Sequence, residues 1–252
     1  MSRRKIYIKR IISDIKEISS YYDEKIHIWY DENDITQIKA LIIGPEDTPY
    51  EDGFFFFSLK FPETYPFDNP SALFETTKKN IRFNPNLYEC GKVCLSILGT
   101  WNGPKWSSVQ TLKSVLLSIQ SLMNENPINN EPQYENVDKN DQRSIDYNKY
   151  IEFHKYSFAI YHVLEYEEFF PYFNNVIQNY FLKNYDKLVG KLNNLKHLDK
   201  TVSKTFIWGH SIQMNYTELI SKYQQLYEKL KNKNISPVEQ TSCHKKMLNQ
   251  DI

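Results

Sequence analysis

The chain has 252 residues, which is enough for one sizeable domain with an extension or a small second domain. Its 31 Lys and Arg residues balance its 31 Asp and Glu residues, so no overall field would draw it to nucleic acid or to an anionic membrane. No apolar run reaches the roughly 18 residues of a membrane-spanning helix, and the first residues lack the pattern of a signal peptide.

The cysteines indicate a free thiol. Cys90, Cys94 and Cys243 are few and odd in number, which argues against a disulfide framework. Cys90 and Cys94 stand four residues apart, but no His or Cys partner lies at metal-binding spacing, so we predict no metal site. We expect the protein to be in a reducing compartment where a free thiol can react, namely the cytoplasm and also the nucleus.

Proline and glycine divide the chain into two parts. Nine of the 11 prolines lie in residues 45–132, whereas 12 of the 19 tyrosines follow residue 132. Many breakers between short apolar runs favour strands and turns, and few breakers favour helices. We therefore expect four segments: a catalytic core over 1–132, a polar joint over 133–146, a helical extension over 147–233 and a disordered polar tail over 234–252.

The first part has the pattern of an α+β fold. Five isoleucines recur at helical spacing and predict an opening amphipathic helix: Ile8, Ile11, Ile12, Ile15 and Ile18. Four runs are typical of strands: 26–30, 35–43, 54–61 and 71–75. Residues 79–104 are irregular, and the apolar spacing over 109–123 predicts a strong helix with Ser107 or Ser108 as its N-cap. This order predicts a helix, a four-stranded antiparallel meander, a long irregular segment and a central helix.

Three stretches of the second part have helical spacing: 146–170, 168–188 and 215–233. The last is the clearest, since its apolar residues form one stripe from Tyr216 to Leu230. Isolated helices of this length are marginal in water, so each stripe needs an apolar partner. That partner is either the extension itself or the first domain near Cys94.

The candidate chemistry lies in residues 82–98, Arg-Phe-Asn-Pro-Asn-Leu-Tyr-Glu-Cys-Gly-Lys-Val-Cys-Leu-Ser-Ile-Leu. A long non-repetitive segment inside a compact domain is uncommon unless it is functional. Cys94 follows Gly91 closely and precedes an apolar run that can anchor it. On spacing alone, however, a buried and inert cysteine is the better interpretation.

Five blocks change that interpretation, because they resemble the core of the ubiquitin-conjugating enzyme family and occur in its order. The blocks are Gly44-Pro45-x-x-x-Pro49-Tyr50-x-x-Gly53-x-Phe55, Phe61-Pro62-x-x-Tyr65-Pro66-Phe67-x-x-Pro70, Asn84-Pro85-Asn86, Gly91-x-Val93-Cys94-Leu95-x-Ile97-Leu98 and Trp106-Ser107. Together they cover about residues 5–132. Two longer blocks, 98–106 and 124–132, and the helical extension resemble the large Z-type subgroup of that family.

The resemblance implies an acyl carrier. An activating enzyme would pass ubiquitin, or a ubiquitin-like protein, to Cys94 as a thioester, for transfer to a lysine of a protein substrate or to a ubiquitin ligase. No cofactor of the chain's own is implied, since the activating enzyme uses the ATP. Asn86 would donate a hydrogen bond to the oxyanion of the transfer step, or brace the loop that does so. An asparagine after Pro85 is also typical of a turn cap.

This sequence departs from the family pattern near the thiol. Asn84 replaces a histidine that is structural in the family, and the loop from Leu98 to Trp106 is four residues longer than in compact members. The family's aspartate, which positions and deprotonates the incoming lysine, corresponds to Asn130, which cannot act as a base. Glu131 is one residue further on and can substitute for it.

Docking of activating enzymes and ligases is also implied by the resemblance. The corresponding positions are Arg3, Arg4, Lys5, Phe67, Ser107 and Ser108. The basic residues among them are, on pattern alone, typical of a solvated helix face.

Two other functions stay open at this point. One is a non-catalytic ubiquitin-binding or scaffold variant of the same fold, although such variants generally lack the cysteine. The other is a cysteine hydrolase, which is disfavoured because the six histidines form no recognisable triad pattern.

Overall fold

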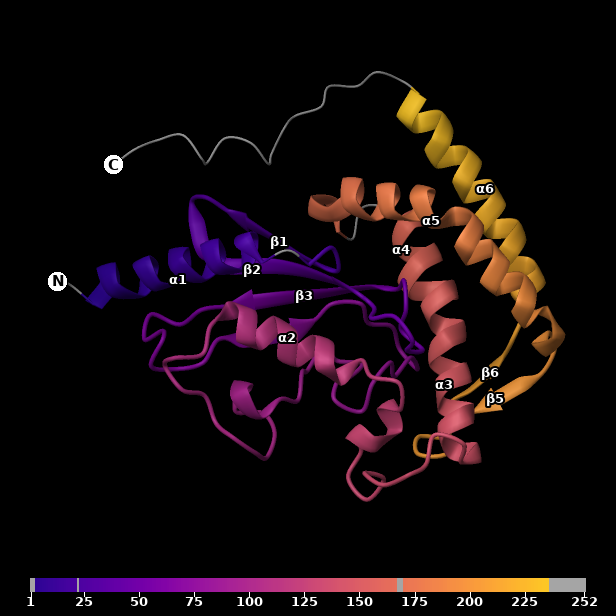
Figure 1. The fold of residues 1–252 in the computed structure, drawn as a ribbon, viewed down its shortest axis with the longest axis horizontal. Helices are drawn as coiled ribbons and strands as arrows, with labels where there is room; N and C mark the ends of the chain where they lie inside the picture. Colours follow the sequence, from indigo (N-terminus) through magenta and orange to yellow (C-terminus); the bar gives the residue numbers. More distant parts are fainter. Residues whose placement is uncertain (1–2, 22, 167–169, 236–252) are drawn as a thin grey trace.

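A computed structural model describes residues 3–21, 23–166 and 170–235. Helix α1 (Arg3–Ser20) leads into an antiparallel sheet whose strands lie in chain order, and helix α2 (Leu112–Leu122) follows the long irregular segment (Figure 1). The strands are β1 (Ile26–Asp31), β2 (Asp34–Ile43), β3 (Phe54–Lys60) and β4 (Ser71–Phe74). The predicted α+β order of helix, four-stranded meander, irregular segment and helix is confirmed.

One face of the sheet packs against α1 and α2. Alternate residues of a strand point to opposite faces, and on this side β2 and β3 bury Ile42, Phe55 and Phe57. Helix α1 covers them with Ile11, Ile15 and Ile18 of the predicted stripe. The prediction was wrong for Ile12, which is 40% exposed. Residues 82–98, the candidate active-site segment, contribute Phe83, Leu87 and Val93 to this first core.

The opposite face is covered by the extension. Four residues of β2 and β3 are buried there: Leu41, Ile43, Phe54 and Phe56. They pack with the helices that follow residue 150, and the ring of Phe56 stacks on that of Phe170 with 3.6 Å between centroids. The run of four phenylalanines in β3 is therefore continuous because the strand is buried on both faces.

The extension is one nearly continuous helical path followed by an antiparallel pair of helices (Figure 1). Its elements are α3 (Gln142–His154), a π-helical stretch (Lys155–His162), α4 (Val163–Glu165), α5 (Asn174–Leu195), β5 (Val202–Lys204), β6 (Ser211–Gln213) and α6 (Tyr216–Ile235). Short 3₁₀ turns occur at Ser96–Leu98, Pro127–Asn130, Pro171–Phe173 and Lys196–Leu198.

The sequence analysis located these helices but not their limits. The first begins at Gln142, inside the expected joint, because Asp141 caps it by accepting a hydrogen bond from the Arg143 amide. The second runs over Asn174–Leu195 rather than 168–188. The β5–β6 hairpin was not predicted at all. The proposed tail lies outside the described residues except for the last two residues of α6, and Cys243 lies in it.

The prediction for the start of the central helix was also wrong. Thr111 is the N-cap, and its side chain and that of Ser114 form a capping box. Ser107 instead begins a separate turn, in which its carbonyl accepts a hydrogen bond from the Gln110 amide at 2.9 Å. Val109 belongs to this turn and is 81% exposed, although its apolar character fitted the helical stripe.

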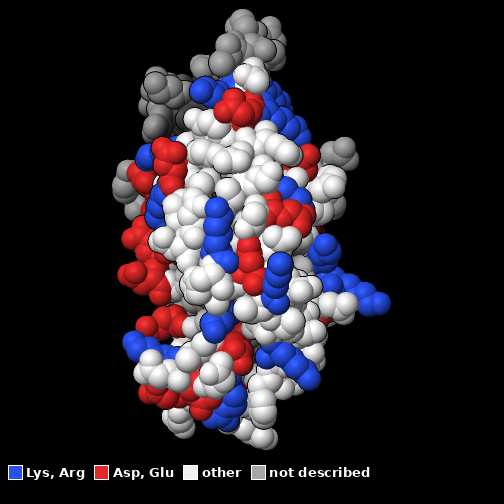
Figure 2. Space-filling view, turned by 90° about the vertical axis from the view of Figure 1, so that its right-hand side faces the viewer, with Lys and Arg blue, Asp and Glu red and all other residues white. Residues whose placement is uncertain are grey.

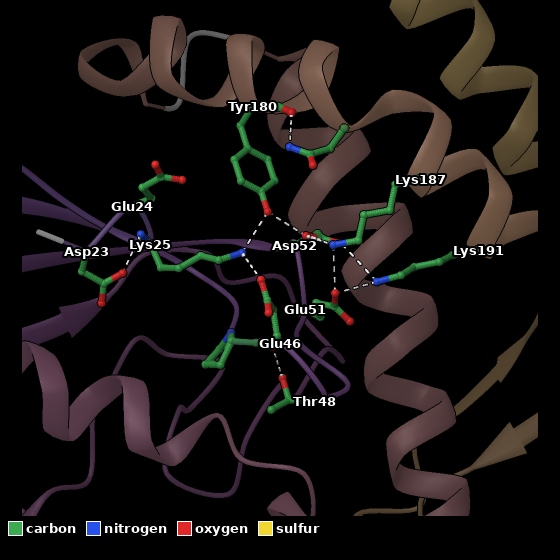
Figure 3. A network of polar contacts seen from close by, with 12 residues as sticks. Asp23, Glu24, Lys25, Glu46, Thr48, Glu51, Asp52, Tyr180, Lys187 and Lys191 are labelled. Atoms are coloured by element: carbon green, nitrogen blue, oxygen red, sulfur yellow. Dashed lines mark hydrogen bonds and ion pairs between the residues drawn. The ribbon is translucent and has the colours of Figure 1, made fainter.

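A network of charges joins α5 to the loop between β2 and β3 (Figure 3). The Asp52 side chain has no exposed surface and lies 3.3 Å from both Lys187 Nζ and Lys191 Nζ. The Tyr180 hydroxyl donates to Asp52 Oδ1 at 2.7 Å, and Lys191 also contacts Glu51 at 2.7 Å. Burial alone would raise the pKa of Asp52, but the hydrogen bond from Tyr180 and the two lysines outweigh it and hold that pKa below its usual value.

The side of the molecule formed by the extension has acidic and basic side chains interspersed among neutral ones (Figure 2). None of the helices in the described part of the chain is long and apolar enough to cross a membrane.

Candidate active site

Of the two cysteines that the structure describes, Cys94 is buried and Cys90 is exposed. Only 1% of Cys94 is exposed, yet it lines a surface pocket. The other residues that line this pocket are Asn86, Leu95, Ser96, Trp101, Leu122, Asn129, Asn130, Pro132 and Glu135. The long loop after Leu98 and the segment after α2 therefore meet at the thiol, so any partner of Cys94 must approach between them.

Gly91 fixes the approach of this segment to the sheet. Its φ is +87°, and a Cβ atom there would lie 2.7 Å from Leu73 Cδ1 and 2.9 Å from the Phe74 carbonyl oxygen. The Phe74 amide donates to the Gly91 carbonyl at 2.7 Å, which attaches the segment to β4. A larger residue would be strained by both the backbone angle and the close contacts.

Thr100 holds the chain on the other side of Cys94. Its hydroxyl donates to the Val93 carbonyl at 2.7 Å and accepts from the Leu95 amide at 2.9 Å. The backbone on both sides of the thiol is thus fixed by one side chain from the long loop. The long loop that follows Leu98 is therefore part of the structure around Cys94.

Asn86 is bonded to Cys94 in both directions. Its side-chain amide donates to the Cys94 carbonyl at 2.8 Å, and the Cys94 amide donates to the Asn86 carbonyl at 2.8 Å. The Oδ1 atom of Asn86 is buried, and no hydrogen-bond partner for it occurs among the described residues. This asparagine thus braces the cysteine and retains an unused acceptor inside the site.

Asn84 and Asn130 form the layer beneath Asn86. The Asn84 Oδ1 atom accepts from the Asn86 amide at 2.9 Å, and its Nδ2 donates to Tyr50 Oη at 2.9 Å and to the Leu122 carbonyl at 2.7 Å. Asn130 donates to the same Leu122 carbonyl at 2.9 Å and to Asn84 at 3.3 Å. Uncharged carboxamides therefore hold this side of the pocket.

The two carboxylates near the thiol differ in position. Glu131 is absent from the pocket lining, and burial raises the pKa of its carboxyl against the lowering effect of Arg82. Glu135 lines the pocket and is exposed to solvent. Glu135 was not predicted, since the family resemblance pointed to residues 130 and 131 and no sequence pattern shows the turn that returns the chain to the pocket.

Of the expected docking residues, the structure describes the side chains of Phe67, Ser107 and Ser108, and these lie on neighbouring loops. Arg10 of α1 donates to the Ser108 carbonyl at 2.8 Å and to the Gln110 carbonyl at 2.6 Å. Trp106 Nε1 donates to the Pro66 carbonyl at 2.7 Å, which places its loop beside Phe67, and Phe67 is 76% exposed. Arg3, Arg4 and Lys5 lie on α1, but their side chains are outside the described part of the structure.

No group of three or more His, Cys, Asp or Glu side chains is arranged to hold a metal ion among the residues that the structure describes. The polar residues that line the pocket are a thiol, three carboxamides, a hydroxyl (Ser96) and a carboxylate. This set suits transfer of an acyl group through sulfur, with the amides as hydrogen-bond donors.

The fold and the site define a family. The sequence model described as "Ubiquitin-conjugating enzyme" matches residues 10–155, which is more than half of the chain. This protein therefore belongs to the ubiquitin-conjugating enzyme family.

Particular relatives extend the similarity through the helical extension. The chain is 39% identical to Ubiquitin-conjugating enzyme E2 Z of Xenopus tropicalis over 228 residues, which are 90% of this chain and 72% of that protein. It is 38% identical to Ubiquitin-conjugating enzyme E2 Z of Homo sapiens over 231 residues, 89% of this chain and 65% of the human protein. It is also 44% identical over 164 residues to Probable ubiquitin-conjugating enzyme protein 17 of Caenorhabditis elegans, 60% of this chain and 22% of that one. The similarity to the large Z-type members, expected from the motifs, is confirmed.

Proposed function

We propose that the chain accepts ubiquitin or a ubiquitin-like protein from an activating enzyme as a thioester on Cys94 and transfers it to a substrate lysine or to a ligase. The observation that carries the proposal is the reciprocal pair of hydrogen bonds between Cys94 and Asn86 at the edge of a surface pocket. A fixed backbone keeps Cys94 in one position at the pocket, first for the activating enzyme that donates the acyl group and then for the lysine or ligase that accepts it.

Two acyl transfers would occur at this sulfur. In the first, the Cys94 thiolate attacks the thioester of the activating enzyme, and the thiol of that enzyme leaves. In the second, a lysine amine attacks the new thioester, loses a proton, and the Cys94 thiolate leaves. Both pass through a tetrahedral oxyanion. In the second transfer, where the amine attacks, the second N–H of the Asn86 carboxamide can stabilise that oxyanion, since its first N–H is committed to the Cys94 carbonyl.

For the proton of the incoming lysine, Glu135 is the carboxylate we favour. It lines the same pocket as Cys94, whereas Glu131 does not. Asn130, at the position of the family's aspartate, takes a supporting role because its amide is bonded to Asn84 and to the Leu122 carbonyl. We expect Glu135→Gln to slow discharge to lysine, with a defect that shrinks at high pH as lysine deprotonates unaided. Glu131→Gln is the matched control and should have the smaller effect.

The main test is a charging assay with a panel of activating enzymes and modifiers, read on a non-reducing gel. The wild-type chain should form one adduct that dithiothreitol removes. Cys94→Ser should form a slower ester that resists dithiothreitol, and Cys90→Ala should behave as the wild type.

The same assay separates this function from a non-catalytic one. A Cys94→Ala chain that still charges would show that the nucleophile is another residue. If the folded wild-type chain forms no adduct with any pair yet binds ubiquitin, the scaffold function replaces the transferase.

A further inference from the structure

Arg82 grips the turn that carries Asn86. Its Nε donates to the Asn84 carbonyl at 3.1 Å, and its Nη2 donates to the Pro85 carbonyl at 2.7 Å. Two N–H groups of one planar guanidinium therefore hold two successive peptide units directly before Asn86. This geometry needs the fork of an arginine, since a lysine has a single ammonium on a flexible stem.

The guanidinium itself contacts two aromatic rings. It lies 3.6 Å from the centroid of Tyr88, which belongs to the same segment, and 4.9 Å from that of Trp208. Trp208 lies in the turn between β5 and β6 and packs edge-on against Tyr147 of α3 at 5.4 Å. The second ring thus comes from the extension, more than 100 residues further along the chain.

The hairpin turn has a fixed shape. The Thr205 amide donates to the His210 carbonyl at 2.7 Å, and Gly209, with a φ of +66°, donates to the Thr205 carbonyl at 3.0 Å. On the same turn, His210 Nε2 lies 3.5 Å from Glu89 Oε1. The turn is therefore attached to the active-site segment at two points, Arg82 and Glu89.

Helix α3 holds the backbone of Arg82 from the same side. The Tyr147 hydroxyl donates to the Arg82 carbonyl at 3.1 Å, and the Tyr150 hydroxyl accepts from the Arg82 amide at 3.3 Å. A path of direct contacts thus runs from Trp208 through Arg82 and the Asn84–Pro85 carbonyls to Asn86, and from its side chain to the Cys94 carbonyl.

We propose that Arg82 is a positioning residue for acyl transfer from Cys94, and that the extension acts on this reaction by holding the Arg82 guanidinium with Trp208. The proposal rests on the proposed function, since it assumes a thioester on Cys94. The extension supplies no reacting group here. It restricts the turn that orients Asn86, and so affects the attack of the lysine amine on the thioester.

The test uses the full chain and separates the two half-reactions. Charging of Cys94 is measured first, and then discharge of the isolated thioester to free lysine at increasing lysine concentration. Trp208→Ala and Arg82→Lys should charge within about twofold of the wild type. Their maximal discharge rate should fall on the order of tenfold to a hundredfold with half-saturating lysine unchanged, because misplacing a reacting group by about 1 Å costs up to that factor.

Two variants control for general damage. Trp208→Phe keeps an aromatic face over the guanidinium and should retain most of the discharge rate. Phe206→Ala removes another aromatic side chain of the same hairpin, one that is 64% exposed and lies 6.3 Å from Tyr134, and should discharge as the wild type does.

Three results would overturn the proposal. Wild-type discharge by both Trp208→Ala and Arg82→Lys would remove the positioning role. An equal loss of charging and discharge would show that the contact serves folding alone. If thermal melting shows that Trp208→Ala is unfolded, the rates of Arg82→Lys are compared instead. A wild-type chain that forms no thioester would overturn the proposed function, and this inference with it.

Discussion

The extension meets the first domain in two regions that differ in their chemistry. At the loop between β2 and β3, α5 contributes lysines to buried and half-buried carboxylates (Figure 3). Beside this network the extension makes a broad apolar contact with β2 and β3. At the active-site segment, the β5–β6 turn contributes a tryptophan and a histidine to Arg82 and Glu89. The first region has the contacts that hold the extension in place, and the second has those that reach Asn86. Changes in the two regions should therefore affect different measurements.

The largest expected effect is on stability, at the sheet. Phe56 is 1% exposed and stacks on Phe170, so Phe56→Ala should lower the free energy of unfolding by about 3–5 kcal/mol through lost burial and a cavity. Denaturant unfolding followed by circular dichroism measures this. Phe67→Ala, at a side chain that is 76% exposed, should stay within about 0.5 kcal/mol. A loss below about 1 kcal/mol for Phe56→Ala would show that the extension is not held by this face.

The next effect is on rate, at the thiol. Asn86→Ala should keep most charging while discharge to lysine slows on the order of a hundredfold or more, equivalent to about 2.7–4 kcal/mol of barrier. Its stability should change by only about 1 kcal/mol, since one hydrogen bond to the Cys94 carbonyl is lost. Equal losses in both half-reactions would instead indicate a folding role for this asparagine.

The charge network should respond to pH and salt. Asp52→Asn should lower the free energy of unfolding at pH 7 by about 1.5–3 kcal/mol, toward the lower end because the two lysines are partly exposed. The folded-state pKa of Asp52 is below its usual value of 3.8, so its contribution is complete above about pH 4 and is lost as the pH falls through the lower value.

Urea unfolding at pH 7 and at pH 3, with low and high salt, tests this prediction. The gap between wild type and Asp52→Asn should be widest at pH 7 in low salt and should narrow in acid. Charging of Cys94 should be unchanged in the variant under conditions where it is folded. A gap that does not vary with pH would assign the loss to packing.

The smallest effect concerns Lys155, which is 2% exposed in the π-helical stretch. Burial lowers its pKa from 10.5 to about 8, partly offset by Glu152 at 3.8 Å. Because the folded-state pKa is the lower one, stability rises with pH between about 8 and 10.5. Lys155→Met should therefore raise the melting temperature at pH 7 by a few degrees, and the gain should shrink by pH 10. A gain independent of pH would contradict this account.

The sequence predicted the first domain well because its signals are local and repeated. Isoleucine spacing in α1, the aromatic and β-branched runs of the strands and the apolar stripe of α2 each depend on neighbouring residues only. The beginning of α2 was predicted too early because Val109 is apolar and at helical spacing, although it lies in the turn before the helix. Arg10 holds the adjacent carbonyls of Ser108 and Gln110 from another helix, and no local pattern records that contact.

For the candidate site, the motifs located Cys94 and Asn86 but not what supports them. Strands β5 and β6 have only three residues each, with one apolar residue apiece, so the hairpin has no alternating pattern to detect. The stacking of Trp208 on Arg82 joins residues far apart in the sequence, and the return of Glu135 to the pocket depends on the turns after α2. These contacts arise from tertiary structure.

The two-sided burial of β3 also has a consequence for synthesis of the chain. Phe56 and Phe181 are 125 residues apart (181 − 56), so a ribosome adding about 5–20 residues per second needs roughly 6–25 s to travel from one to the other. Until the extension has been made, the face of β3 that carries Phe54 and Phe56 lacks its apolar partners. We therefore expect the first domain to expose an apolar sheet face during synthesis until α5 has emerged, and to be prone to aggregation in that interval.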